Sequence, residues 1–157
     1  MTKMGDEPIL IGGFEKREIR IVDYDPEWPA QYETHAKIIA VALSNALMRV
    51  EHIGSTSVPG LAAKPIIDIL AVVEDSADEA SYVPKLEAAG YALRVREPNF
   101  YEHRMFRTSA RDVHVHVYSL GTPDSSLCHK SGSGQTLNRK TERGGDSRSR
   151  DLLFLSR

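Results

Sequence analysis

The sequence has only one cysteine, Cys128, among its 157 residues. A single thiol cannot form an internal disulfide or a cysteine-based metal cage, so both are excluded. Long apolar runs are also lacking: none approaches the roughly 18 residues of a membrane-spanning helix, and the N-terminus has no apolar core of a secretory signal. We therefore expect a cytoplasmic protein that has no membrane partner.

An excess of positive charge is lacking too. The formal net charge is −2 at pH 7, and residues 121–157 carry seven Lys or Arg against four acids, so residues 1–120 carry −5. Non-specific binding of nucleic acid requires a basic face, so nucleic acid is not expected as a partner. A small anionic ligand held by a few placed cations is compatible with this charge.

The composition is that of one soluble globular domain, with 41% hydrophobic and 27% charged residues. Apolar periodicity predicts a strand, a helix, two strands, a second helix and three more strands. This order indicates an α/β (α+β) fold, a mixed β-sheet with helices packed on one face. In chain order, the expected elements span 18–24, 25–47, 48–53, 66–73, 77–89, 91–96, 100–108 and 113–120.

The segment around Gly54 suggests a site for phosphate and metal. An apolar strand breaks at Gly54, a Gly-Ser-Thr turn follows, and the next strand carries one acid, Asp68, among apolar neighbours. Glycine lets a phosphate approach the backbone, the N–H groups and hydroxyls of the turn can donate hydrogen bonds, and a carboxylate ligates hard cations. The alternative is an ordinary turn followed by a structural aspartate that has a partner.

The last two expected strands, 100–108 and 113–120, are joined by a short turn and form a hairpin. This hairpin holds a second group of candidate site residues. His114 and His116 lie two residues apart, which places both imidazoles on one face of the strand, about 7 Å apart along it. Such a pair can chelate a metal together with Asp68 from a neighbouring strand. In the preceding strand, Arg104 and Arg107 point to opposite faces. The alternative is that both histidines are half-exposed sheet residues.

These motifs resemble those of the GrpB family, small proteins assigned to the nucleotidyltransferase superfamily. The superfamily pattern is a hydrophobic residue, Gly and Ser, about a dozen residues, and an acid–hydrophobic–acid triplet. Ile53-Gly54-Ser55 and Asp68 fit this pattern, while Leu70 stands where the second acid is expected. Asp25-Pro26-Glu27-Trp28-Pro29 and His114-Val115-His116-Val117 are also similar to GrpB sequences.

The resemblance implies a nucleotidyltransferase-like domain over residues 18–120, preceded by a flexible lead-in over residues 1–17. It also implies metal-dependent nucleotidyl transfer or nucleotide binding, with Asp68 as the catalytic residue. The ligand would be a nucleotide or another small phosphorylated molecule, and the cofactor Mg²⁺ or Mn²⁺. The expected nucleotide-binding residues are Gly54, Ser55, Thr56, Lys64, Arg104 and Arg107, and the expected metal ligands are Asp68, His114 and His116.

The missing second acid leaves open whether the protein is an enzyme, because two-metal transfer usually needs more than one carboxylate. One alternative is a catalytically silent binding module for a nucleotide or phosphorylated metabolite. Related domains occur fused to dephospho-coenzyme A kinases. Another alternative is a metal-dependent hydrolase or metal-binding protein that uses the His-x-His strand, with His52 facing the same cleft. The sequence predicts no particular oligomeric state.

Residues 121–157 depart from the GrpB pattern. Seven Ser, five Gly and seven basic residues are scattered without a helical or strand period until Leu152. We expect a poorly ordered tail. A frameshifted or truncated end would give the same change in composition.

Overall fold

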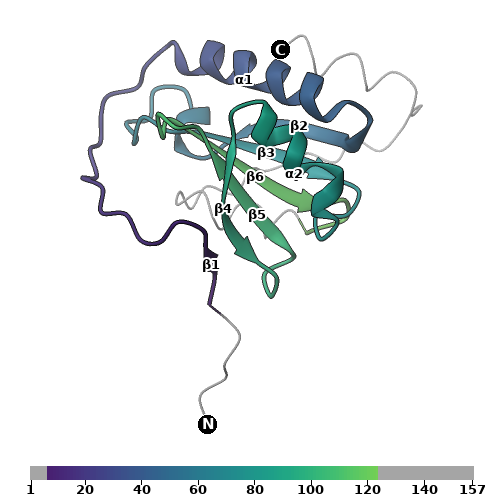
Figure 1. The fold of residues 1–157 in the computed structure, drawn as a ribbon. Helices are drawn as coiled ribbons and strands as arrows, with labels where there is room; N and C mark the ends of the chain where they lie inside the picture. Colours follow the sequence, from purple (N-terminus) through teal and green to yellow (C-terminus); the bar gives the residue numbers. More distant parts are fainter. Residues whose placement is uncertain (1–6, 124–157) are drawn as a thin grey trace.

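The computed structural model describes residues 7–123, which form one six-stranded mixed sheet with helices against it (Figure 1). Within these residues the strand order is β1-β4-β5-β6-β3-β2, and β3 and β6 are the parallel pair. The α+β fold class expected from the sequence is confirmed. The strands are β1 (Ile9–Leu10), β2 (Leu47–Ile53), β3 (Ile67–Val73), β4 (Ala92–Glu97), β5 (His103–Arg107) and β6 (Val113–Ser119); the α-helices are α1 (Trp28–Leu43) and α2 (Val83–Ala88).

The two faces of the sheet differ because side chains alternate along each strand. On the helix face, Ile69 of β3 and Val115 of β6 lie in the main core with Ile39 of α1 and Leu86 of α2. Packing against α1 and α2 removes this apolar surface from water, which drives the fold. The opposite face, which we call the site face, carries Asp68, Leu70 and Val72 of β3 and His114, His116 and Tyr118 of β6.

Proline and local backbone geometry explain why both helices are shorter than expected. Pro84 lies in the first turn of α2, the only place where a proline without an N–H fits a helix, so α2 begins at Val83 rather than near 77. Pro29 has the equivalent place in α1, which begins at Trp28 rather than near 25. The chain leaves α1 at Ser44, which has φ 48°, and a short 3₁₀ turn leads into β2.

The strand expected over 18–24 is wrong. Only Val22 pairs there, in an isolated bridge with Ala63, and Ile19 and Ile21 are exposed. The first strand of the sheet is instead β1, whose two residues pair with β4 at one edge. Alternating apolar residues are not sufficient for a strand, because the backbone also needs a neighbour with which to form its hydrogen bonds.

No helix within residues 7–123 has the length and apolar character that crossing a membrane requires. The expected tail over 121–157 lies outside the described residues from position 124 onward.

Candidate metal centre

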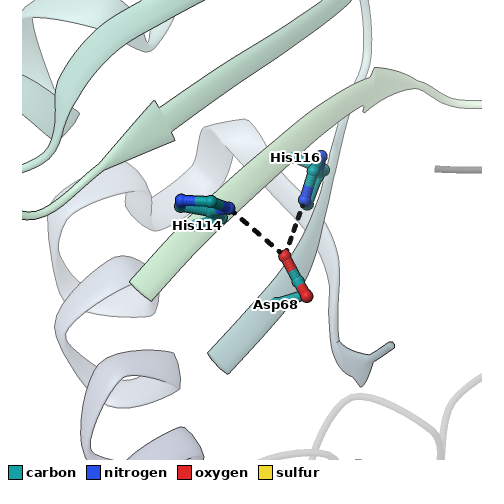
Figure 2. Close-up of side chains that lie close together, drawn as sticks. All are labelled: Asp68, His114 and His116. Atoms are coloured by element: carbon teal, nitrogen blue, oxygen red, sulfur yellow. Dashed lines mark hydrogen bonds and ion pairs between the residues drawn. The ribbon is translucent and has the colours of Figure 1, made fainter. Parts of the chain in front are cut away.

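Asp68, His114 and His116 converge on the site face because β3 and β6 are parallel neighbours. Their register places Asp68 opposite His114 and Leu70 opposite His116. Asp68 Oδ1 lies 3.1 Å from His116 Nε2 and 3.6 Å from His114 Nδ1. Figure 2 shows both imidazoles turned toward this carboxylate. One ligand atom from each residue lies within 4.8 Å of the other two. The structure thus brings together the three residues that the sequence named as metal ligands.

Two of the three separations suit a metal ion. Ligand atoms about 2.1 Å from an ion are roughly 3.0 Å apart at an octahedral angle and roughly 3.4 Å apart at a tetrahedral angle. The two Asp68–imidazole distances, 3.1 and 3.6 Å, lie close to these values. One carboxylate oxygen and two imidazole nitrogens form a donor set typical of transition-metal sites.

Asp68 is ionised over the whole physiological range. Burial by itself raises the pKa of this carboxyl group, but the neighbouring imidazoles of His114 and His116 outweigh burial and hold the pKa at about 2. Among residues 7–123, no arginine or lysine forms an ion pair with this carboxylate, and its negative charge would stabilise a cation at the cluster.

A second pair of residues continues the cluster behind His116. His116 Nδ1 lies 3.1 Å from His103 Nε2, and His103 Nδ1 lies 2.5 Å from Glu97 Oε2. Both imidazoles are almost fully buried, with 2% of His103 and 7% of His116 exposed, and the His103 ring stacks on Tyr118. Four side chains from four strands thus form a line from Glu97 to Asp68.

This line has one hydrogen too few if both imidazoles are neutral. Each of the three contacts requires one hydrogen between its two polar atoms, and two neutral imidazoles carry only two. When Glu97 accepts from His103 and His103 accepts from His116, the Nε2 lone pair of His116 faces the Asp68 carboxylate. An additional proton or a metal ion must separate these two acceptors. The same hydrogen-bond pattern orients metal-bound histidines in known sites.

The turn at Gly54 lies directly against Asp68. Gly54 has φ +77°, and a side-chain Cβ at this position would lie 2.9 Å from Asp68 Oδ2. The structure therefore gives the glycine a role at the carboxylate: a side chain here would be both strained and in collision. In the following 3₁₀ turn, Thr56 is buried and its hydroxyl donates to the Ile66 carbonyl and contacts His52 Nε2, so this hydroxyl already has structural partners.

The comparisons with known proteins fit the pattern of strands and motifs. A family model described as GrpB protein matches residues 18–129. The chain belongs to the GrpB family. It is 56% identical over 106 residues to a UPF0157 protein of Halalkalibacterium halodurans, which covers 68% of this chain and 54% of that relative. The chain spans about half the length of the curated relatives of this kind that it matches.

Two further similarities concern a solved structure and an enzyme. The crystal structure of conserved protein GrpB from Enterococcus faecalis matches with a TM-score of 0.56 and 35% identity, over 66% of this chain and 63% of that one. A dephospho-CoA kinase of Mycolicibacterium paratuberculosis is 43% identical over 76 residues, which are 46% of this chain and 19% of the kinase. The second similarity covers a small part of the kinase and establishes no activity for this GrpB-family chain.

Two residues expected at the site lie elsewhere in this GrpB-family chain. Arg104 faces the helix side of the sheet, where its guanidinium pairs with Glu79 at 2.7 Å and Glu102 at 2.9 Å. His52 also faces the helices and stacks on Tyr32, and burial lowers its pKa to about 4. The strand alternation puts both side chains on the face opposite Asp68.

The other expected binding residues are closer or more exposed. Arg107 is the register partner of His114 on the site face, and its guanidinium donates to Glu15 at 2.8 Å. Ser55 lies half-buried in the turn after Gly54, and Lys64 is exposed in the segment that leads into β3.

His103 and Glu97 were not anticipated from the sequence, although a signal exists. His103 is two residues before Met105, which pairs with His116, so an antiparallel hairpin places His103 and His116 on one face. Recognising this required the hairpin register, which the turn length alone did not define.

Proposed function

We propose that this GrpB-family chain binds a divalent metal ion through Asp68, His114 and His116, and that the ion helps to bind a small phosphorylated ligand. The observation that carries the proposal is the mutual distance of the three ligand atoms, all within 4.8 Å. Glu97 and His103 support it, because they hold the ring of His116 with Nε2 toward Asp68.

The donor set favours Mn²⁺ over Mg²⁺ among the two expected cofactors. Mg²⁺ prefers oxygen ligands and usually keeps several waters, whereas imidazole is a common ligand for transition metals, including Zn²⁺. Three protein ligands leave coordination positions for another group. A divalent ion held by one carboxylate also keeps a net positive charge, which attracts phosphate oxygens. When bound, the ion would supply Lewis-acid polarisation of a phosphoryl oxygen.

A nucleotide is the first candidate for the ligand. The Gly54 turn adjoins the Asp68 carboxylate, and the order of strand, Gly-Ser turn and acid-bearing strand supports a nucleotidyltransferase-like assignment. Ser55 would contact phosphate, and Lys64 and Arg107 would supply positive charge. The similarity to part of a dephospho-CoA kinase is compatible with a nucleotide-like ligand.

The geometry of the site favours a protein that binds the ligand without catalysing a reaction. Leu70, at the position of the second acid, is buried on the site face and adds no oxygen ligand. A silent binding module needs only the three metal ligands, whereas nucleotidyl transfer usually needs further carboxylates. Metal-dependent hydrolysis is the second candidate, since the His-x-His strand and Asp68 form a complete three-ligand set.

Thermal unfolding and calorimetric titration test the metal site. Chelator-treated protein is titrated with MnCl₂, ZnCl₂ or MgCl₂. A ligand at a hundredfold excess over its dissociation constant adds about 2.7 kcal/mol to the free energy of unfolding, so the midpoint rises. We expect Asp68→Asn and His116→Ala to lose this rise, and the exposed control Asp23→Asn to retain it. If none of the three metals binds the wild-type protein, the proposal is wrong.

A second titration, with ATP in the presence of the metal that binds, tests the ligand. Metal-dependent binding that disappears in Asp68→Asn supports a nucleotide at this site, and release of pyrophosphate or phosphate would favour catalysis over a silent module. Metal binding without any effect of ATP would retain the metal centre and exclude ATP as its ligand.

A further inference from the structure

Three arginines converge at the end of the sheet, near the β5–β6 turn. Arg94 comes from β4, Arg107 from the end of β5, and Arg111 from the turn before β6. All three guanidiniums contact the carboxylate of one residue, Glu15. The distances are 2.8 Å from Arg107 and 2.9 Å from Arg111 to Glu15 Oε2, and 3.5 Å from Arg94 to Oε1.

Hydrogen bonds at both ends hold the segment that carries Glu15 against the three arginines. β1 pairs with β4, and the Ile11 N–H continues the pairing by donating to the Arg94 carbonyl at 2.8 Å. Gly12 then passes over Arg94 with φ +86°, and any side chain there would collide with the guanidinium. Figure 1 shows this segment running from β1 along the outside of the sheet toward α1. Arg17 donates to the Arg111 carbonyl at 2.8 Å and fixes its far end.

One carboxylate neutralises only part of the charge of three guanidiniums. The four side chains together carry +2, and like charges held this close repel one another. The hydrogen bond from Arg107 is the main reason that the pKa of Glu15 is lowered, so the carboxylate stays ionised. A dianion with three acceptor oxygens, such as a phosphate group, would match the three guanidiniums better in charge and in number of acceptors.

The space beside the arginines can admit such a group. A groove of about 460 Å³ is lined by Arg94, Arg107 and Arg111, by small residues and by one acid, Glu87. Arg111 lies in the β5–β6 turn and has φ +61°, a left-handed conformation that is uncommon for a residue with a side chain.

We propose that Arg94, Arg107 and Arg111 form a binding site for the phosphate group of a small molecule, and that Glu15 occupies this site when the ligand is absent. Arg107 pairs across the hairpin with His114, so the site lies beside the metal centre on the same sheet. The proposal goes beyond the proposed function because it requires neither a metal ion nor Asp68. Phosphate must displace the Glu15 carboxylate in order to bind. This competition lowers the apparent affinity of the protein for phosphate.

Calorimetric titration with inorganic phosphate, in chelator-treated protein without divalent cations, tests the site. Glu15→Gln keeps the shape of the side chain and removes its charge, so we expect it to bind phosphate about tenfold more tightly than the wild type. The exposed control Glu18→Gln should bind like the wild type. The double variant Glu15→Gln/Arg111→Gln should lose the gain. Equal affinity of the wild type and Glu15→Gln, or no binding by either, would overturn the proposal.

A second measurement uses the unaltered protein. If phosphate displaces Glu15, hydrogen exchange of the backbone amides over residues 11–17 should accelerate when phosphate is added, because the segment loses its anchor. Unchanged exchange at a saturating phosphate concentration would contradict displacement. Neither measurement contains a divalent metal ion, and metal binding is titrated separately, so failure here is distinguishable from failure of the metal centre.

Discussion

Replacing Gly54 by alanine should damage both the stability of the fold and the metal centre. Gly54 has φ +77° and ψ −172°, a region that only glycine occupies readily. A side chain forced into such a region costs of order 1–3 kcal/mol. The added Cβ would also lie 2.9 Å from Asp68 Oδ2 and 3.2 Å from Asp68 Cβ, so the carboxylate must move. We expect Gly54→Ala to lose about 2–3 kcal/mol of unfolding free energy.

Gly60→Ala is the matched control. Gly60 has a similar φ of +80°, but nothing lies within 4 Å of the position that its Cβ would occupy. It should therefore lose only the backbone term, about 1 kcal/mol. Urea denaturation measures both losses.

Metal titration then separates strain from damage to the site. Displacing the Asp68 carboxylate should weaken metal binding by at least about tenfold, a typical effect of disturbing the groups around a metal ligand. Gly60→Ala should bind the metal like the wild type. If Gly54→Ala matches Gly60→Ala in stability and also binds metal with wild-type affinity, the argument that glycine is needed for the Asp68 carboxylate is refuted.

Four other predictions concern the surroundings of the site, the core and the surface. Glu97→Gln should weaken metal binding by about 10- to 100-fold in calorimetry, because it loosens the hydrogen bonding that orients His116; unchanged affinity would remove Glu97 from the site. Phe106→Ala should lose about 3–5 kcal/mol in urea denaturation, since the ring is fully buried. Phe14→Ala, at a ring that is 96% exposed, should change stability by less than about 0.5 kcal/mol. Burial lowers the pKa of His52 to about 4, below the 6.5 of an exposed imidazole. Its neutral form thus contributes stability that is present above pH 6.5 and is lost as the pH falls toward 4, by up to about 3 kcal/mol. Urea denaturation at pH 7 and pH 5 should show a smaller difference for His52→Gln than for the wild type; an equal difference would contradict this.

Local patterns predicted the central strands well. The apolar run that ends at Gly54, the run around Asp68 and the hairpin of β5 and β6 all appear in the structure near their expected bounds. Each of these strands is long and pairs with a neighbour along most of its length. The predictions from the sequence were less accurate where the presence of a neighbouring strand decides whether a segment becomes a strand. The residues over 18–24 alternate like a strand but have only one bridge, and the two-residue β1 exists because β4 offers it an edge.

The sequence by itself determined that His114 and His116 share one face of a strand, because side chains alternate along any strand. It also determined that Arg104 and Arg107 face opposite ways. Only the tertiary structure decided which face meets the helices, and therefore that Arg104 pairs with Glu79 whereas Arg107 lies beside His114. The face of a strand depends on which side buries more apolar surface across the whole sheet.

The tertiary structure also decided which polar groups surround the three ligands. His103 and Glu97 reach His116 through the register of β4, β5 and β6, and Glu15 reaches the arginines through the pairing of β1 with β4. These registers depend on hydrogen bonds between segments far apart in the chain, which no local sequence pattern contains. The sequence therefore contains the residue types of the metal centre, but only the pairing of the strands brings these residues together.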